Sequence, residues 1–600
     1  MLSPRVCMLI RFWLPVVGLA AVAGYSSLKL VLAHLDPEVK SINYMFERDL
    51  IAPRGCVYDC CGRSLARSVP FWDYHLDPVA LTNRVVKNSR REPRRPPLAI
   101  VKTIATALGL PYAKVKAMSE DVKHLYQPLG LSRDQKAHDI LANSKLVAGV
   151  VIEDRQVRQY IHRNRFSHVV GFVNAEGVGS AGIEQRYDRL LTGTPGRIRG
   201  MRDAHGRELY DKRVVSTDPI PGADVYLTLD QNIQYEAQTA LADGLREFGA
   251  DSGWCLILNA KTAAILAMVS LPDFTPAAYG RASEGALVNR TCAFTYEPGS
   301  VMKVITAATG IEAGLVSPDT LYATNRDDDR YYRLPGDGSH VWEPRMTVRD
   351  ALVHSSNIVI GKLGVDIGPA RLWTSMRNFG FGQKTGLELP GEESGLLPHW
   401  KKWDKVKWSR APIGQGVAVT AIQLASAYQA IANDGVRMKP HLVQKIVAAD
   451  GIKLYEHLDE PVGRPISVRT ARQIRESLLG VASREGTARR AALKGYSVAG
   501  KTGTAQKVVN RHYSDHLFRA TFCGMVPASA PELVILVTLD FDQRAKYHQG
   551  GNSSAPIFRR IATAVLRYLM IAPDRPEELT DADEECDEYE QMQEERARSL

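Results

Sequence analysis

A serine and a lysine three positions apart, Ser300 and Lys303, stand at the start of a predicted helix, directly after T-Y-E-P-G. Positions i and i+3 share one face of a helix, so the lysine amine can reach the serine hydroxyl. A serine hydroxyl becomes nucleophilic when a nearby base removes its proton, and a lysine is such a base when it is neutral. The pair therefore predicts nucleophilic catalysis by Ser300, with Lys303 as its base.

Two further short elements carry groups suited to the same chemistry. The sequence S-S-N begins at Ser355, where a serine can relay a proton and the amide of Asn357 can hold a substrate carbonyl. The sequence K-T-G begins at Lys501, at the end of a predicted strand. Lys501 and Thr502 can bind a carboxylate, and Gly503 lets the backbone approach a substrate.

Each element has a second copy that weakens it when taken alone: S-x-x-K at Ser26, S-x-N at Ser41 and K-T-G at Lys384. Order and context separate the first set from these copies. Its serine-lysine pair heads a helix, the S-x-N element follows, and its K-T-G element belongs to a predicted sheet. The combination favours serine acyl transfer over chance.

The elements that position these residues indicate an α+β domain over 222–573. The predicted strands are residues 225–229, 254–258, 264–269, 496–499, 520–526 and 533–539, and the predicted helices include 301–311 and 555–571. The short turn at 259–262 predicts a hairpin, and the short connections after 496 favour an antiparallel meander. We therefore expect the five strands from residue 254 onward to form a five-stranded antiparallel sheet with flanking helices and a large helical insertion after the first hairpin.

The amino terminus predicts a membrane anchor over residues 12–33. Its uncharged stretch follows Arg5 and Arg11 and is about long enough to cross a ~30 Å hydrocarbon core. The flanking arginines favour a cytoplasmic 1–11 and an exported remainder. A cleaved signal peptide is the alternative, because Ala21–Ala23 resembles a processing site. Both interpretations export the chain.

Composition sets broad limits. A chain of 600 residues with 45% hydrophobic and 24% charged residues is not fully disordered, collagen-like or a multi-span transporter. Its length predicts two or three domains, with a separate domain over 40–215. The net charge of +10 fits several partners and selects none. The basic run at 84–97 lacks interleaved aromatics, so we expect no nucleic-acid binding, and the acidic segment 575–600 is predicted to be disordered.

The eight cysteines do not predict a disulfide scaffold or a metal site. Cys56, Cys60 and Cys61 are clustered, but the others are dispersed. A structural zinc site needs four ligands at a recognisable spacing, and none appears in the sequence. We therefore expect no metal.

With the three elements in order, the sequence resembles a class B penicillin-binding protein from the membrane segment to about Asp574. Other family-like stretches are R-G-C-V-Y-D-C-C-G-R-S-L-A at Arg54–Ala66, G-F-V-N at Gly171–Asn174, A-G-I-E at Ala181–Glu184, L-T-G-T-P-G at Leu191–Gly196, G-Q-G-V-A-V-T at Gly414–Thr420 and V-A-G-K-T-G-T-A-Q-K at Val498–Lys507. Cys60 stands where the family usually has arginine, so we expect one ion pair to be absent. The resemblance implies a single transmembrane helix, an elongated non-catalytic platform domain over 40–215, and a penicillin-binding/serine β-lactamase-like transpeptidase domain.

The resemblance also implies the reaction and its residues. Ser300 is expected to attack the carbonyl between two D-alanines of a peptidoglycan stem peptide, and the acyl-enzyme then passes to a neighbouring amine. The implied roles are Lys303 as base, Ser355 in proton transfer, Asn357 in donor binding, Lys501 and Thr502 in carboxylate binding, Gly503 in substrate approach, and the N–H groups of Ser300 and Thr504 as oxyanion hole. β-Lactams are expected to acylate Ser300, and no cofactor is implied.

G-F-V-N and the stretch around Lys501 resemble the division-specific (septal) members more than the elongation-type members. The implied location is the bacterial inner membrane, with one span, the amino terminus inside and the bulk periplasmic. The implied partners are a polytopic glycosyltransferase and other division proteins. The E-D-x-x-F motif of a glycosyltransferase domain is missing. An elongation-type transpeptidase, a D,D-carboxypeptidase, a β-lactamase and a catalytically idle scaffold are the alternatives.

Overall fold

The computed structural model of the chain describes residues 17, 19–29, 45–83, 98–124, 126–143, 149–202, 208–326, 331, 334–337, 342–509, 512–543, 545 and 548–579. Of the predicted anchor, residue 17 and residues 19–29 are described and are helical. None of the helices in these ranges is long and apolar enough to cross a membrane. The basic run at 84–97 and the acidic segment beyond residue 579 lie outside the described residues.

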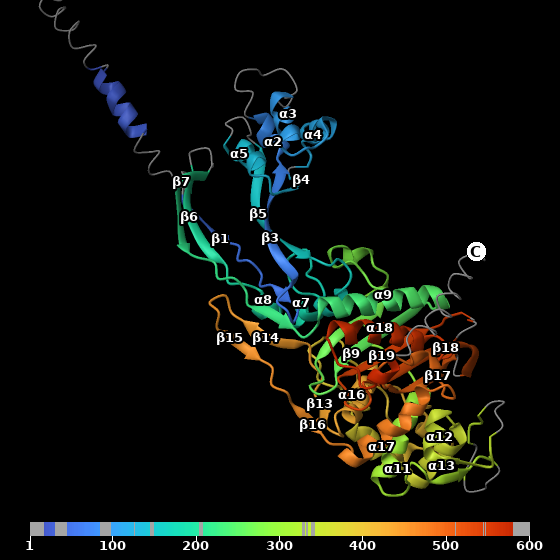
Figure 1. Cartoon of the computed structure of the whole chain (residues 1–600). Helices are drawn as coiled ribbons and strands as arrows, with labels where there is room; N and C mark the ends of the chain where they lie inside the picture. Colours follow the sequence, from blue (N-terminus) through green and yellow to red (C-terminus); the bar gives the residue numbers. More distant parts are fainter. Residues whose placement is uncertain are drawn as a thin grey trace, which may run out of the picture. The chain divides into compact units, whose positions relative to one another are not determined.

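A five-stranded antiparallel sheet in the order β10-β9-β19-β18-β17 confirms the predicted sheet (Figure 1). Its strands are β9 (Ser252–Asn259), β10 (Ile265–Leu271), β17 (Ala499–Val509), β18 (His512–Val526) and β19 (Leu533–Asp540). The first two form the predicted hairpin, and the last three form the predicted meander. Strand β19 pairs with β9, with Val537 opposite Cys255, and so joins the meander to the hairpin across the helical insertion.

The strand expected over residues 496–499 is wrong in its bounds. Strand β17 begins at Ala499 and continues to Val509, so Lys501 lies within the strand rather than at its end. Two glycines lower the strand propensity here, but pairing with β18 overrides that preference. The N–H of Ser497 donates to the carboxylate of Asp574 at 2.8 Å, which holds the preceding residues outside the ladder.

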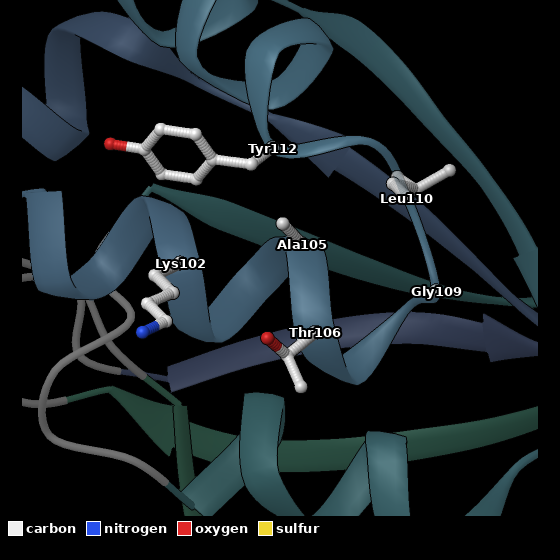
Figure 2. A pocket seen from close by; sticks show the side chains of 6 residues that line it. All are labelled: Lys102, Ala105, Thr106, Gly109, Leu110 and Tyr112. Carbon is white, nitrogen blue, oxygen red and sulfur yellow. The ribbon is translucent and has the colours of Figure 1, made fainter.

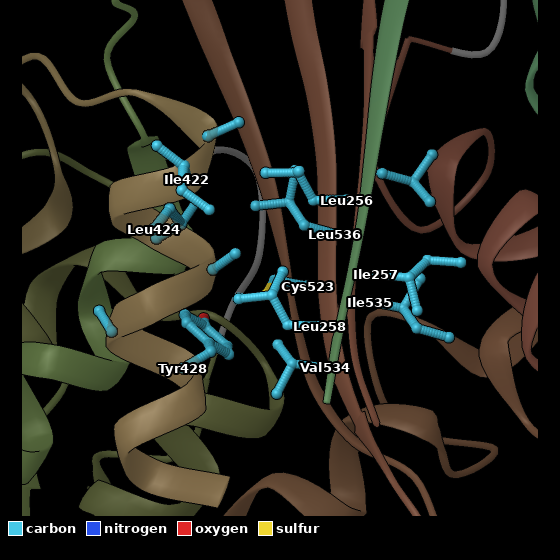
Figure 3. Packing of buried hydrophobic residues seen from close by; sticks show 14 of the residues in the cluster. Leu256, Ile257, Leu258, Ile422, Leu424, Tyr428, Cys523, Val534, Ile535 and Leu536 are labelled. Atoms are coloured by element: carbon cyan, nitrogen blue, oxygen red, sulfur yellow. The ribbon is translucent and has the colours of Figure 1, made fainter. Parts of the chain in front are cut away.

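Helices cover both faces of this sheet. The helix α16 (Ala421–Ala432) packs on one face, and α9 (Gln231–Phe248) and α18 (Ser554–Tyr568) pack on the other. Figure 3 shows the two layers: Leu256, Leu536 and Tyr428 on the α16 side, and Ile257 and Ile535 on the opposite side. Because both faces are covered, β9 and β19 are continuous apolar runs without polar alternation.

The helical insertion between β10 and β17 surrounds α11 (Lys303–Glu312), whose residues are buried except the last. Its other elements are η1 (Pro276–Arg281), α10 (Glu284–Leu287), η2 (Gly299–Met302), β11 (Leu321–Ala323), β12 (Arg345–Thr347), α12 (Val348–Val353), α13 (Asn357–Ile367), α14 (Pro369–Asn378), η3 (Trp400–Lys402), α15 (Lys405–Arg410), η4 (Ala411–Ile413), β13 (Arg437–Met438), β16 (Pro461–Gly463), α17 (Val468–Leu479), η5 (Gly480–Ala482) and η6 (Arg489–Ala491). The hydroxyl of Thr306 donates to the carbonyl of Pro412 at 2.7 Å and ties α11 to η4.

The chain divides into two compact units, and each contains a sheet outside the one above. In the unit of residues 1–51 and 195–219, β1 (Met45–Leu50), β6 (Gly196–Arg202) and β7 (Glu208–Thr217) form a three-stranded sheet. In the other unit, a seven-stranded sheet contains β2 (Val57–Tyr58), β3 (Ser64–Leu76), β4 (Gln127–Ser132), β5 (Val150–Tyr160), β8 (Asp224–Leu227), β14 (Val443–Val447) and β15 (Lys453–Glu456). This sheet combines strands from both sides of residue 215.

Arginines form ion pairs around the start of this seven-stranded sheet. Glu184, which has no exposed surface, accepts from Arg54 and Arg158, each at 2.6 Å. The turn after β2 carries Cys60, where an ion pair was expected to be absent. An arginine three positions later supplies one: Arg63 lies 2.7 Å from Asp59 and 3.2 Å from Asp230, measured between nitrogen and carboxylate oxygen.

A small helical lobe lies between β3 and β5 in the sequence. It comprises α2 (Pro78–Asn83), α3 (Leu98–Ala107), α4 (Tyr112–Glu120) and α5 (Gln135–Asn143), which share a core of their own. Figure 2 shows a groove on this lobe, lined by residues of α3, α4 and the turn between them, including Lys102, Thr106 and Tyr112. No predicted site residue lines it. Three short helices follow β5: α6 (Ser167–Val170), α7 (Gly182–Arg186) and α8 (Asp188–Leu191).

Candidate active site

The turn that carries Ser300 is fixed by close contact between two backbones. Residues Gly299–Met302 form the 3₁₀ turn η2, so Ser300 lies just before the α-helix and not within its first turn. Gly299 has φ 60°, in the left-handed region that favours glycine. Its N–H donates to the carbonyl of Gly414 at 3.2 Å, and a Cβ on Gly414 would lie 2.2 Å from the Gly299 carbonyl oxygen. The half-buried Ser300 therefore stands in a tightly held turn.

Lys303 begins α11 and has no exposed surface. Its Nζ donates to the carbonyl oxygen of Ser355 at 2.5 Å and to the Oγ of Ser355 at 3.2 Å. Burial lowers the pKa of Lys303 to about 7, and the charge of Asp337 opposes part of that shift. Near neutral pH a substantial fraction of this amine is unprotonated, which is the state a general base requires.

Ser355 connects two helices in an unusual backbone conformation. It lies between α12, which ends at Val353, and α13, which begins at Asn357, and its φ is 61°. Few residues with a side chain adopt this left-handed region. Both the carbonyl and the hydroxyl of Ser355 accept hydrogen bonds from Lys303 in this conformation. Strain of this kind concentrates at functional sites.

Asp337 organises the start of α13, and the sequence analysis did not select it. Its carboxylate accepts hydrogen bonds from the Ser356 hydroxyl at 2.7 Å, the Asn357 N–H at 2.5 Å and the Trp342 indole at 2.9 Å. The side-chain amide of Asn357 donates to the carbonyl of Gly336 at 2.7 Å. Within the described part of the chain, that amide makes no hydrogen bond with the lysines of the site. Its orientation is thus set by the 334–337 segment.

Lys501 lies in the edge strand β17 and is fully buried. Burial and the positive charge of Lys303 lower the pKa of Lys501 well below its usual value. Its Nζ donates to the carbonyl of Thr502 at 3.4 Å. The two lysines, distant in sequence, are therefore close enough in space for their charges to interact.

Glycine allows the edge strand to lie directly against the Ser300 turn. A Cβ on Gly503 would lie 3.0 Å from the carbonyl oxygen of Pro298 and 3.2 Å from a methyl carbon of Val301. Two strand hydroxyls are hydrogen-bonded: Thr502 Oγ1 donates to Thr487 Oγ1 at 3.0 Å, and Thr504 Oγ1 accepts from the N–H of Gly550 at 3.3 Å. The structure thus gathers the Ser300 turn, Lys303, Ser355 and the start of β17 at one place.

Comparison with known families identifies this arrangement. Residues 253–563 match the penicillin binding protein transpeptidase domain, and residues 49–227 match the penicillin-binding protein dimerisation domain. The chain belongs to the class B penicillin-binding proteins. It is a peptidoglycan D,D-transpeptidase.

Individual relatives cover most of the chain. Penicillin-binding protein PbpB of Mycolicibacterium smegmatis is 35% identical over 452 residues, which are 71% of this chain and 68% of that protein. Peptidoglycan D,D-transpeptidase FtsI of Escherichia coli is 29% identical over 530 residues, 87% of this chain and 84% of that protein. A crystal structure of penicillin-binding protein 3 from Mycobacterium tuberculosis, complexed with aztreonam, has a TM-score of 0.66 and 28% identity, covering 88% of this chain and 99% of that one.

The second copies of the three elements lie in other surroundings. The copy at Ser26 is in an exposed helix, and the copy at Ser41 lies outside the described residues. Lys384 is exposed in a loop and belongs to no strand of the transpeptidase sheet. The copies that the sequence analysis selected are therefore the ones that the fold of this class B protein assembles.

Glu297 is a second residue that the sequence analysis missed. It accepts hydrogen bonds from the N–H of Gly416 at 2.8 Å and from the hydroxyl of Tyr513 at 3.1 Å. Burial raises the pKa of Glu297 above its usual value. The residue thus ties the segment before Ser300 to the 414–416 loop and to β18. The sequence signal for Glu297 was its position three residues before Ser300 in E-P-G-S. Its hydrogen-bond partners are remote in the sequence, so its contacts could not be predicted.

Proposed function

We propose that Ser300 is the nucleophile of this transpeptidase and that neutral Lys303 is its base. The observation that carries this proposal is the buried Lys303 amine, which lies one turn after Ser300, contacts Ser355 and has a pKa lowered to about 7. A lysine that loses its proton near neutral pH can accept the hydroxyl proton as the serine attacks. The rigid turn around Gly299 supports a fixed line of attack.

The reaction transfers an acyl group between two amines. Ser300 Oγ bonds to the carbonyl carbon between two D-alanines, the amide C–N bond breaks, and the terminal D-alanine leaves with the proton that Lys303 took. An amine of a neighbouring stem peptide then displaces Ser300, which regains a proton. Ser355 is hydrogen-bonded to Lys303 and is placed to pass the proton from Lys303 to the amine of the leaving D-alanine.

The other residues bind the donor peptide. Lys501 and Thr502 bind its terminal carboxylate, and the N–H groups of Ser300 and Thr504 form the oxyanion hole. The Asn357 amide donates one of its two N–H groups to Gly336, so its second N–H can hold a carbonyl of the donor backbone. Gly503 allows the donor to lie along β17, since its strand already approaches the Ser300 turn without a side chain between them.

The test is intact-protein mass after exposure of the detergent-solubilised full chain to benzylpenicillin, which we propose acylates the same serine. The expected result is one stable adduct on the wild-type chain and none on the Ser300→Ala variant. Ser26→Ala is the matched control because it removes the other S-x-x-K serine, and its adduct should equal that of wild type. An adduct on the Ser300→Ala variant would overturn the assignment of the nucleophile. Loss of the adduct within seconds would indicate a β-lactamase.

We propose further that residues 12–33 anchor the chain in the inner membrane with 1–11 inside, that 40–215 form the platform, and that 222–573 catalyse septal cross-linking. Support for the septal role comes from G-F-V-N and from V-A-G-K-T-G-T-A-Q-K, which resemble division-type members. The platform then contacts a polytopic glycosyltransferase and other division proteins.

Depletion in the native bacterium separates the septal role from elongation. A septal enzyme gives filaments without septa on depletion, and a fluorescent fusion gathers at mid-cell. Rounded cells and a lateral signal would indicate the elongation-type alternative. Stem-peptide analysis with purified chain addresses the remaining alternatives: cross-linked dimers indicate transpeptidation, and shortened monomers without dimers indicate carboxypeptidation.

A further inference from the structure

Three side chains that are not part of the transpeptidase site meet at the turn after β2. The sulfur atoms of Cys60 and Cys61 lie 3.7 Å apart. Each also lies near the same oxygen of Asp230, Oδ2, at 3.6 Å for Cys60 and 3.7 Å for Cys61. The three atoms therefore form a nearly equilateral triangle. Asp230 is buried, Cys60 is half-buried and Cys61 is exposed.

This triangle has the dimensions of one face of a tetrahedral zinc site. Zinc binds thiolate sulfur at about 2.3 Å and carboxylate oxygen at roughly 2.0–2.2 Å, which places neighbouring ligand atoms roughly 3.5–3.8 Å apart. The observed separations fall within that interval on all three sides. Two adjacent thiols and a carboxylate are also a donor set that a thiophilic divalent cation accepts. The sequence analysis expected no metal because it found no four ligands at a recognisable spacing, and Asp230 is far from both cysteines along the chain.

Neighbouring groups hold Asp230 in a position to act as a ligand. Its other oxygen, Oδ1, accepts the N–H groups of Asn232 at 2.7 Å and Ile233 at 3.2 Å and so caps α9. Oδ2 accepts from the hydroxyl of Tyr568 at 3.0 Å and lies 3.2 Å from the guanidinium of Arg63. Contacts of this kind orient a ligating carboxylate in known metal sites.

The charge balance also permits a divalent cation beside Arg63. Before binding, the two thiols are neutral and the carboxylate carries one negative charge. A divalent cation displaces the two thiol protons, and the two thiolates, the carboxylate and the cation again sum to one negative charge. The net charge that faces Arg63 is therefore the same before and after the cation binds, so binding does not weaken the ion pair between Arg63 and Asp230.

We propose that Cys60, Cys61 and Asp230 bind a thiophilic divalent cation such as Zn²⁺, with a water in the fourth position on the exposed side of Cys61. The cation links the β2–β3 turn to the first turn of α9, and through Tyr568 to the end of α18. Its role is structural, since the three ligands are not among the residues that hold Ser300. The site is independent of the transpeptidation proposal.

The test uses the reduced, metal-free full chain in detergent, dialysed against Zn²⁺ and then analysed for bound metal. The expected result is one equivalent of Zn²⁺ in wild type and a raised thermal unfolding midpoint in the loaded protein. With Co²⁺ as a probe, a sulfur-to-cobalt charge-transfer band should appear. Because the cation displaces two thiol protons, affinity should fall as the pH is lowered.

Matched variants separate this site from other thiols. Cys60→Ser, Cys61→Ser and Asp230→Asn should each lose the bound equivalent and the shift in unfolding midpoint. The asparagine keeps the cap of α9, because its oxygen accepts the same N–H groups, and it removes the second oxygen together with its contacts to Arg63 and Tyr568. Cys56→Ser is the control and should bind as wild type does. No bound metal in the reduced wild type, or binding that survives in Cys60→Ser, would overturn the proposal.

Discussion

Two Lys-Thr-Gly sequences in this chain share three residues and differ in everything that surrounds them. At Lys384 the threonine of the tripeptide forms hydrogen bonds within its own loop. The N–H of Thr385 donates to the carboxylate of Glu392 at 2.6 Å, and the Thr385 hydroxyl donates to the same carboxylate at 2.5 Å. At Lys501 the tripeptide lies in the edge strand, where the threonine hydroxyl contacts Thr487 across the site. The first threonine therefore binds a carboxylate of its own loop, whereas the second donates to another hydroxyl.

The lysines differ as sharply as the threonines. Lys384 is exposed, whereas Lys501 is fully buried and its pKa is lowered by burial and by Lys303. The difference comes from strand pairing, because β17 places Lys501 in the ladder opposite Cys523 and against the Ser300 turn. A motif of three residues therefore acquires its chemistry from partners that the tripeptide does not specify.

The largest effect is expected from Lys303→Met, which removes both the proposed base and the lysine whose charge helps to lower the pKa of Lys501. General-base catalysis contributes about 10²–10⁴-fold, so the acylation rate constant with benzylpenicillin should fall by about that factor. The apolar side chain fits the buried position. Because burial lowers the pKa of Lys303 from its usual 10.5 to about 7, the variant also removes the cost of burying an amine, so we expect it to remain folded.

Lys362→Met is the matched control for this variant. Lys362 is also buried, in α13, and donates to the carbonyl of Ala323 at 3.1 Å, away from the Ser300 turn. Its acylation rate constant should stay within a few-fold of wild type, measured by stopped-flow with a fluorescent penicillin. Equal losses in the two variants would show that a buried lysine matters only for the fold and would remove the assigned role of Lys303.

The direct test of the comparison is Lys501→Ala beside Lys384→Ala. A hydrogen bond to a charged group contributes about 1.5–3 kcal/mol, so loss of Lys501 should slow acylation by roughly 10–100-fold. Lys384→Ala should change it less than twofold, because the exposed side chain has no place in the site. The same fluorescent-penicillin assay measures both. A larger loss from Lys384 than from Lys501 would reverse the assignment of the two motifs.

Site residues could be predicted from the sequence where they belong to one short motif. They could not be predicted where their role depends on a partner that is remote in the sequence. Ser300, Lys303, Ser355 and Lys501 follow from short patterns whose residue types carry the chemistry. Asp337 was missed because P-G-D-G reads as an ordinary turn, and only the fold shows that it orients α13.

The fold shows the same division. Hydrophobic runs predicted the five strands, but the glycines beside Lys501 hid the true extent of β17, which depends on pairing with β18. In the amino-terminal region, nothing near Cys60 indicates that Asp230 lies beside it. Contacts of that range depend on packing of the whole domain.

A smaller, graded effect is expected from pH. The proposed mechanism requires neutral Lys303, whose pKa is about 7, so the acylation rate should be level above about pH 8 and fall about tenfold per unit well below pH 7. Asp337 holds that pKa up, so Asp337→Asn should shift the falling limb to lower pH. Lys384→Ala should leave the profile unchanged. A profile that is flat between pH 5 and pH 8 would contradict a neutral-lysine base.

The smallest effect on catalysis is expected from Glu392→Gln, which opens the second Lys-Thr-Gly loop without touching the site. Glu392 is 5% exposed and accepts hydrogen bonds from the backbone N–H groups of Thr385 and Gly386 and from the Thr385 hydroxyl. Glutamine removes the charge and replaces one accepting oxygen by a donor, so this half-buried loop loses a hydrogen bond to a charged group, at a cost of about 1–3 kcal/mol of unfolding free energy. Urea unfolding should show that loss, while acylation stays at the wild-type rate. A fall in acylation with unchanged stability would mean that this loop, and not only β17, contributes to the site.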